Sequence, residues 1–535
     1  MIKVRVFILG MLGCAVAALI SSCAQIRGIS GGEKDTTPPT LTSSSPENFS
    51  TRFNSKTITL EFDEYVQLNN VQQELIVSPP PKVKPLVRLR DKKVSIELRD
   101  ALLPNTTYTF NFGKGIVDVN EANSVNNLLY VFSTGDKIDS LAVSGKVEDA
   151  WERIPVAGIK LMLYDSMSQE NPYTKNPYYF SRSADDGSFT IPYLHEGNYQ
   201  MIALEDLNDN FRLDGDERMA FLNETVSPTV NDSSLVKYPL RLSKMRPEKP
   251  RLVEYDVDSA GVLKIPWDEF YGALQMEPIA SDGLDWVQWF DAKRDTAYLW
   301  LSGLVPDAYI NTRVIWNNEI LDTLEVPFFT EALSDSIELR NNISSKWKKT
   351  DNIIITAEEF LFLNVSAVVK LLEDSNVIDC RIENLNEGNK YGVEAKFKDG
   401  KKYELTIFPG TFTNALSATN DTTTIFFQTY RMEDLGQLNM NVSGLIADSV
   451  YQIILEKPGS LSVKQNLTSD GPMVFQGLIP GEYSLRLFAD SEIQNGLWDP
   501  AAFNIGRQPE PVWVYPQKIT VRANWELNLD WKLED

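Results

Sequence analysis

Apolar and polar residues alternate along most of this chain in short runs. The segments 56–66, 91–100, 107–112, 401–410 and 422–430 all show this period of two. Such alternation is typical of β-strands that have one buried face. Gly, Asn, Asp and Pro separate the runs, and long helical periods are scarce. The pattern therefore predicts an all-β chain of sandwich modules, each of roughly 85–110 residues.

The chain also repeats itself. The segment LHEGNYQMIALED (194–206) matches LIPGEYSLRLFAD (478–490), and the glycine and the final aspartate are equally far apart in both. VSGKV at 143–147 likewise matches VSGLI at 442–446. Internal similarity over such a distance indicates two copies of one module.

Two family resemblances follow from short motifs. DTTPP (35–39), EFDEYV (61–66) and the closing FST (132–134) resemble the S-layer-type bacterial Ig-like domain, a family common in lipoproteins of the Bacteroidota. Residues 333–432 resemble it more faintly. The Gly-x-Tyr turns, together with SADDGSFTIPYL (183–194), resemble the transthyretin-like or carboxypeptidase-regulatory-like β-sandwich. These resemblances imply folds and say little about function.

The N-terminus reads as a lipoprotein signal. Lys3 and Arg5 precede an apolar run at 6–20, which is short for a membrane-spanning helix and ends in Ser-Ser before Cys23. Small residues before a cysteine form a lipobox, so we expect cleavage and an N-terminal lipid on Cys23; a plain secreted protein is the alternative. Ala24 resembles the sorting signal of outer-membrane lipoproteins. We expect an outer-membrane anchor that displays the chain at the cell surface; the periplasmic face of the outer membrane is the alternative location.

These observations divide the chain into seven segments. They are a signal peptide (1–22), a lipidated tether (23–36), an S-layer-type Ig-like module (37–136, module 1), a transthyretin-like module with an Asp-rich loop (140–245, module 2), a β-sandwich without a specific resemblance (246–332, module 3), a divergent second Ig-like module (333–432, module 4) and a second transthyretin-like module (433–535, module 5).

The Asp-rich loop of module 2, EDLNDNFRLDGDER (205–218), has the spacing of a twelve-residue calcium loop. With Asp206 as position 1, the later ligand positions fall on five residues: Asn208, Asn210, Arg212 through its carbonyl, Asp214 and Glu217. Hard oxygen donors without His or Cys suit Ca²⁺. Phe211 replaces the usual glycine at position 6. We expect a structural Ca²⁺ site here, with a solvated turn as the alternative, and a weak or absent second site near Asp490 and Asp499.

Composition argues against several classes of function. The net charge of −23 disfavours nucleic acid as a partner. His195 is the only histidine and lies in a turn, and no nucleotide, zinc-hydrolase or nucleophile-elbow motif occurs, so we expect no enzyme. Cys380, in a predicted strand, is expected to be a buried, inert thiol.

Aromatic residues are the remaining candidates for a function. Trp286, Trp289 and Trp300 lie close together in module 3, and Trp513 and Trp525 lie near the C-terminus. Core packing, an interface anchor and a carbohydrate platform are all compatible with them. The leading hypothesis is a string of modules, about 30–40 Å each, that acts as an interaction or scaffold subunit. Its partners would be outer-membrane proteins, such as a β-barrel assembly, export or transport complex. The alternative is a surface glycan-binding lipoprotein.

Overall fold

The structure is a computed structural model. It describes residues 36–533 except 126–127, 216, 231–237, 246–249, 251, 253, 258–261, 268–273, 280–285, 291–295, 302–307, 317, 329–335, 358–359, 365–367, 386–388, 415–416, 447–448, 460–461, 492–493 and 495. Cys23 and the signal peptide lie outside the described residues. The all-β prediction is confirmed: strands dominate every module. No helix among the described residues is long and apolar enough to cross a membrane.

Module 1 packs a four-stranded sheet, in the order β1-β2-β6-β5, against the three-stranded sheet β4-β7-β9. The alternation at 57–62 alternately buries and exposes side chains, so Ile58 faces Ile96 and Leu60 faces Val94 inside the sandwich. The elements are β1 (Leu41–Ser45), β2 (Thr57–Phe62), β3 (Val66–Leu68), α2 (Val71–Glu74), β4 (Ile76–Ser78), β5 (Leu86–Arg90), β6 (Lys93–Glu97), β7 (Thr107–Asn111), β8 (Ile116–Asp118) and β9 (Leu129–Ser133).

Module 2 forms one continuous sheet in the order β12-β11-β14-β15-β17-β10-β13, with β16 paired to β10. Strands β11 and β14 are buried on both faces, which matches their almost uninterrupted apolar sequence. The elements are β10 (Leu141–Asp149), β11 (Lys160–Tyr164), α3 (Asn171–Thr174), β12 (Tyr179–Arg182), β13 (Ser188–Leu194), β14 (Gln200–Leu204), β15 (Arg218–Phe221), β16 (Thr229–Val230) and β17 (Tyr238–Lys244).

Module 3 pairs a sheet ordered β18-β19-β22-β21 with a sheet ordered β20-β23-β24. Its strands are β18 (Asp256–Val257), β19 (Val262–Pro266), β20 (Leu274–Pro278), β21 (Trp286–Phe290), β22 (Thr296–Leu301), β23 (Ala308–Trp316) and β24 (Glu319–Phe328).

Module 4 contains three sheets around one apolar core. Its strands are β25 (Ser336–Ile337), β26 (Arg340–Asn341), β27 (Lys346–Trp347), β28 (Ile353–Thr356), β29 (Phe362–Leu363), β30 (Val369–Glu373), β31 (Asn376–Ile378), β32 (Cys380–Asn384), β33 (Tyr391–Ala395), β34 (Lys402–Ile407), β35 (Phe412–Thr413), β36 (Thr419–Asn420) and β37 (Thr423–Thr429).

Module 5 repeats the strand order of module 2. Its sheet β41-β38-β45 matches β13-β10-β17, with the same parallel pair, and β40-β39-β42-β43 matches β12-β11-β14-β15. The elements are η1 (Met432–Asp434), β38 (Gly436–Ser443), β39 (Tyr451–Glu456), β40 (Val463–Leu467), β41 (Gly471–Leu478), β42 (Gly481–Ala489), η2 (Phe503–Ile505), β43 (Val512–Val514), β44 (Ile519–Val521) and β45 (Glu526–Lys532).

One sequence match in this repeat is out of register. Val442 pairs with Gly471, whereas Val143 pairs with Ile191, so the two VSG segments occupy different places in their strands. The Gly-x-Tyr turns do correspond, because the Tyr199 hydroxyl donates to the His195 carbonyl at 3.1 Å and the Tyr483 hydroxyl to the Ile479 carbonyl at 2.7 Å. The turn chemistry, not the VSG motif, therefore aligns the two copies.

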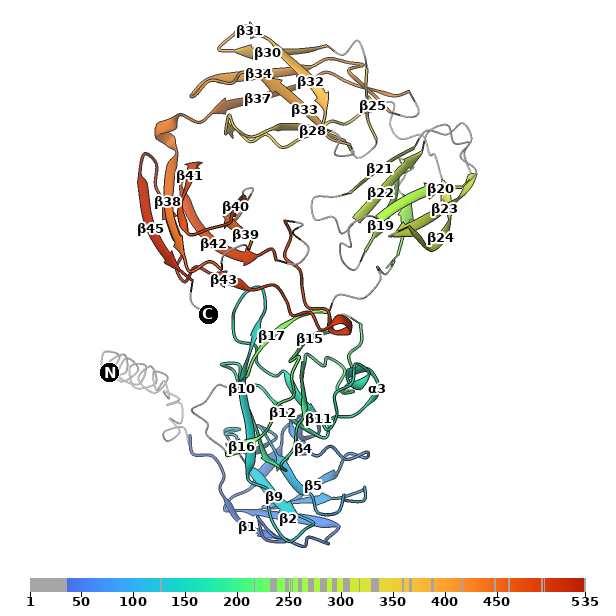
Figure 1. The fold of residues 1–535 in the computed structure, drawn as a ribbon, viewed down its shortest axis with the longest axis vertical. Helices are drawn as coiled ribbons and strands as arrows, with labels where there is room; N and C mark the ends of the chain where they lie inside the picture. The colour runs from blue at the N-terminus through green and yellow to red at the C-terminus, as the bar shows by residue number, and fades with distance from the viewer. Residues whose placement is uncertain are drawn as a thin grey trace, which may run out of the picture.

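The modules do not form an extended string. Figure 1 shows modules 1 and 2 stacked at the blue-green end and module 5, in red, returning to module 2, so that modules 2 to 5 follow a closed path. The returning segment is residues 496–511, which we call the clasp. The Phe503 ring of the clasp lies 4.9 Å from the Phe221 ring, and the Gln508 side chain donates to the Phe221 carbonyl at 3.1 Å.

A second contact beside the clasp strengthens this closure. Trp151 of module 2 packs against Phe488 and Trp498 of module 5, with ring centroids 5.9 and 5.3 Å apart. The Arg486 guanidinium stacks 4.5 Å from the centre of the Trp151 ring and pairs with Glu152 at 2.7 Å. Aromatic burial and cation–π contact are the interactions expected of a stable interface.

Candidate functional site at the junction of modules 1 and 2

The Asp-rich loop is held by a buried lysine. Lys160 lies on β11 opposite Leu204, the last residue of β14, and the loop begins two residues later. The Lys160 ammonium is 2.6 Å from Asp206 Oδ2, and the two side chains are 3% and 0% exposed. The same ammonium contacts Asp209 Oδ1 and lies 4.3 Å from the centre of the Phe211 ring. Lys160 thus compensates two loop carboxylates inside the protein.

Backbone amides complete the loop. Asp206 accepts from the amides of Asn210 at 3.1 Å and Phe211 at 2.7 Å, and Asn210 Oδ1 accepts from the Arg212 amide at 2.6 Å. Phe211 adopts a positive φ of 60°, which provides the sharp turn that a glycine makes at this position in calcium loops. The exposed Asn208 and Asn210 amides both point to Asp214, at 3.2 and 2.8 Å.

Glu217 connects the two ends of the loop through hydrogen bonds. Its two carboxylate oxygens accept from the amides of Leu207 at 2.9 Å and Asp214 at 3.2 Å. Burial raises the pKa of Glu217, and the nearby charges of Asp214 and Asp206 act in the same direction. Asp209 behaves in the opposite way: burial alone would raise its pKa, but hydrogen bonds from Lys160 and Lys84 hold that pKa below its ordinary value.

The loop has a partial fit to Ca²⁺. The oxygen-bearing side chains of Asp206, Asn208, Asn210, Asp214 and Glu217 accept or donate hydrogen bonds within the loop, with backbone amides or with Asp214, and this donor set suits a hard cation. However, Lys160 already supplies a positive charge to Asp206. No group of three or more His, Cys, Asp or Glu side chains is arranged to hold a metal ion in the part of the chain that the structure describes. The Arg212 carbonyl would complete the predicted set, and calcium there stays a prediction.

Module 5 has a counterpart of this site that the sequence spacing concealed. Gln452 faces Phe488 as Lys160 faces Leu204, and Asp490 follows two residues later, as Asp206 does. The equivalent of Glu217 is Glu510, whose oxygens accept from the amides of Ser491 at 2.9 Å and Asp499 at 3.0 Å.

The charge balance of the counterpart differs. Asp490, Asp499 and Glu510 are all buried, and neutral Gln452 takes the place of Lys160. Burial raises the pKa of Glu510 to about 7, and Asp499 and Asp490 contribute to the rise. Spacing alone does not reveal Glu510, because Glu510 follows Asp499 only at the far end of the clasp, whereas Glu217 lies three residues after Asp214.

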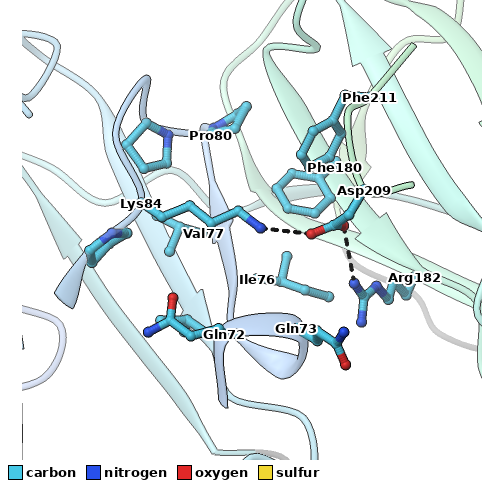
Figure 2. A pocket seen from close by; sticks show the side chains of 13 residues that line it. Gln72, Gln73, Ile76, Val77, Pro80, Lys84, Phe180, Arg182, Asp209 and Phe211 are labelled. Carbon is cyan, nitrogen blue, oxygen red and sulfur yellow. Dashed lines mark hydrogen bonds and ion pairs between the residues drawn. The ribbon is translucent and has the colours of Figure 1, made fainter. Parts of the chain in front are cut away.

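The loop also faces module 1 across a cavity. Figure 2 shows Asp209 paired with Lys84 of module 1 and with Arg182 of β12, at 2.7 and 3.8 Å. Phe211 packs edge-on against Phe180, with centroids 4.7 Å apart. The Phe180 amide donates to Ser78 Oγ of module 1 at 3.1 Å. The predicted calcium loop is therefore part of a module junction.

The tryptophans of module 3 do not share one surface. Trp300 is 2% exposed and stacks on Phe360 of module 4, with centroids 4.8 Å apart and planes 9° apart. Trp289 stacks on Tyr298 at 5.3 Å and contacts Phe360 at 5.4 Å. Trp286 is 41% exposed. Two of the three thus pack at the junction of modules 3 and 4, and one is available to a partner.

The remaining residues that the sequence singled out do not lie together in one site. Trp513 is half-buried against Tyr451, with centroids 6.1 Å apart, and Trp525 is 61% exposed with the Arg522 guanidinium 5.4 Å from its ring. His195 lies in an exposed turn, where its Nδ1 is 3.2 Å from Asp139. Cys380 is half-buried on an antiparallel pair, β32 with β33, and burial raises its thiol pKa, which favours an unreactive thiol.

Comparisons with known proteins address module 1. Residues 35–134 match the bacterial Ig-like domain family. No curated protein matches the chain. Domains 5–6 of the S-layer protein SbsC align with 34% of this chain and 99% of that chain, at 11% identity and a TM-score of 0.18.

The pilin and adhesin comparisons are equally distant. The major pilin subunit BcpA of Bacillus cereus aligns with 74% of this chain and 99% of that chain, at 8% identity and a TM-score of 0.13. The Escherichia coli adhesin FdeC aligns with 49% and 99%, at 11% identity and a TM-score of 0.13. Scores this low carry no information about function. The comparisons support a bacterial Ig-like domain in module 1.

Proposed function

We propose that this chain is a non-enzymatic scaffold, anchored by lipid at Cys23 to the outer membrane and displayed at the cell surface. It would hold outer-membrane proteins, such as the components of a β-barrel assembly, export or transport complex. The observation that carries this proposal is the closure of modules 2 to 5 by the clasp. A closed frame fixes several sandwich surfaces relative to one another, which suits a subunit that positions its partners.

The apolar cluster where module 2 meets module 1 and the clasp supports this role. It contains Ile76 of module 1, buried residues of module 2 such as Met162 and Phe221, and Ala501 and Phe503 of the clasp. One cluster thus joins three modules. Independent binding modules on a string would have little reason to share such a core, because interfaces between domains that move are usually small and polar.

The glycan-binding alternative has less support. A sugar platform requires exposed, coplanar aromatic rings. Trp300 is buried, Trp289 packs against module 4, and exposed Trp286 and Trp525 lie on different modules. The scaffold proposal therefore explains more of the aromatic residues than glycan binding does, because several of these residues pack at contacts between modules.

Calcium would act structurally in this proposal. Bound at the loop of Asp206 to Glu217, it would stiffen the segment that faces module 1. Extracellular calcium is abundant enough to fill sites with dissociation constants of ~10⁻⁴–10⁻³ M. Asp214 and Asn208, which are exposed, would be the ligands most accessible to the ion.

The test is a pull-down of the affinity-tagged full chain from outer membranes in mild detergent, with cross-links mapped by mass spectrometry. We expect a stoichiometric outer-membrane partner that cross-links to at least two modules. A Cys23→Ala variant, which lacks the acylation site, is the matched control. This variant should be absent from the membrane fraction, and its pull-down should not recover the outer-membrane partner. Recovery of the wild-type chain alone would contradict the scaffold proposal.

A further inference from the structure

The cavity between modules 1 and 2 has the chemistry of a ligand site. Its walls include Ile76, Val77 and Pro80 of module 1 and Phe180 and Phe211 of module 2, as Figure 2 shows. The volume is about 60 Å³. Because one water needs ~10–15 Å³, the cavity has room for roughly four non-hydrogen atoms, the size of a branched aliphatic side chain.

The charges at the rim of the cavity are unequal. The charged side chains that line the cavity are two cations, Lys84 and Arg182, and one carboxylate, Asp209, which pairs with both. Asp209 also contacts Lys160, which lies behind the lining and is paired with Asp206. This local positive excess occurs in a chain whose net charge is −23. An additional carboxylate beside Lys84 and Arg182 would complete the charge balance.

Both cations can reach a ligand. The Lys84 and Arg182 side chains are partly exposed, whereas Lys160 is enclosed. Arg182 lies 3.8 Å from Asp209, which leaves most of its donors for another acceptor. The exposed side chains of Gln72 and Gln73 also line the cavity and offer amide donors and acceptors.

We propose that this junction cavity binds the C-terminal residue of a peptide chain: an apolar side chain enters the cavity, and the terminal carboxylate pairs with Lys84 and Arg182. The Gln72 and Gln73 amides match the polar backbone of the preceding residue. A short fatty acid shares the combination of apolar group and carboxylate, but it lacks a backbone for these amides. The inference is independent of the scaffold proposal, since it concerns only modules 1 and 2.

The experiment measures binding of small probes to the full chain by saturation-transfer NMR. The probes are acetyl-glycyl-leucine with a free carboxylate, the same dipeptide as its C-terminal amide, and hexanoate. We expect the free acid to bind about tenfold more tightly than the amide, the ratio that one charge-assisted hydrogen bond typically supplies. Equal affinities for acid and amide, or no binding of the acid at 20 mM (about the weakest affinity useful here), would overturn the proposal.

Variants locate the site. Lys84→Met and Arg182→Gln should each weaken binding of the free acid about tenfold. Lys82→Met removes the same charge from an exposed position outside the cavity and should leave binding unchanged. If Lys82→Met lost as much affinity for the free acid as Lys84→Met does, binding would depend only on general electrostatic attraction, and the proposal would be contradicted. Tighter binding of hexanoate than of the dipeptide would refute the peptide assignment. Unchanged thermal unfolding of each variant verifies the fold.

Discussion

At the scale of single residues, modules 2 and 5 differ in how they stabilise a buried carboxylate at the same position of the fold. A buried carboxylate at the end of a central strand needs a partner. Module 2 supplies a charged one, Lys160, to Asp206. Module 5 instead places the neutral Gln452 near Asp490, at 3.4 Å, so no cation offsets its carboxylates, among them Glu510, the equivalent of Glu217. The stability of module 2 should therefore depend on Lys160, and the stability of module 5 should depend on pH.

Replacing Lys160 by Met should destabilise module 2 strongly. Asp206 would remain buried without its ion-pair partner, and breaking a buried pair typically costs ~3–5 kcal/mol. Hydrogen exchange followed by mass spectrometry should show this loss in peptides of β11 and β14. Lys84→Met removes a partly exposed partner of Asp209 and should cost less than about 1 kcal/mol. Similar protection in wild type and Lys160→Met would contradict this account.

Glu510 should make module 5 less stable at neutral pH than at acidic pH. Its folded pKa of about 7 lies above the unfolded value of 4.5, so the folded state binds more protons between these values. Stability therefore falls as pH rises from about 4.5 to 7, by roughly 3 kcal/mol in total, since each unit of pKa difference is worth ~1.4 kcal/mol.

Exchange of β42 and β43 peptides at pH 5 and 8, corrected for the intrinsic rate, measures this effect. The Glu510→Gln variant should show a much smaller difference between the two pH values. An equally large pH dependence in that variant would assign the effect to another group, such as Asp499 or Asp490.

At the scale of elements, sequence predicts what is local. The alternation at 57–62 predicted a strand because the period of two is a property of the strand itself. The Gly-x-Tyr turns aligned the modules because each turn makes its own hydrogen bond. Val442 was misaligned because an isolated VSG segment does not specify which residue faces it across the sheet.

The site was predicted only where its residues are close in sequence. Asp206 to Glu217 lie on one loop, so their spacing was visible. Lys160 comes from a neighbouring strand, and Glu510 lies at the far end of the clasp, so the proximity of each to the loop aspartates depends on how strands pair. The packing of Trp300 on Phe360 is likewise a contact between modules and leaves no local pattern.

The Asp-rich loop is the element whose behaviour should respond to metal. After removal of metal ions with a chelator, 1 mM Ca²⁺ (about the upper range for extracellular sites) should slow hydrogen exchange in residues 205–215. Asp214→Asn removes an exposed predicted ligand and should weaken the response about tenfold. Asp185→Asn, an exposed aspartate outside the loop, is the control and should respond as the wild type does. No response in the wild type would indicate a loop held by Lys160 and hydrogen bonds alone.

At the scale of the whole molecule, the clasp decides between a closed frame and an extended string. Its Phe503 is buried in the apolar cluster shared with modules 1 and 2, and Trp151 of module 2 packs into a second cluster with Phe488 of module 5. Large-to-small substitution of a buried aromatic residue costs ~3–5 kcal/mol. This is comparable with the stability of an interface between domains, so loss of both rings should open the frame.

The Trp151→Ala/Phe503→Ala variant should therefore be longer in solution, because only polar contacts would then hold modules 2 and 5 together. Small-angle X-ray scattering should report an increase in radius of gyration of at least about 5 Å, toward the value for a row of separate domains. Phe426→Ala removes an exposed ring of module 4 and should leave the scattering curve unchanged. If the double variant keeps the wild-type curve, closure depends on Arg486 and the clasp hydrogen bonds. If it opens and also loses its outer-membrane partner in the pull-down, the fixed geometry of the frame is what the partner recognises.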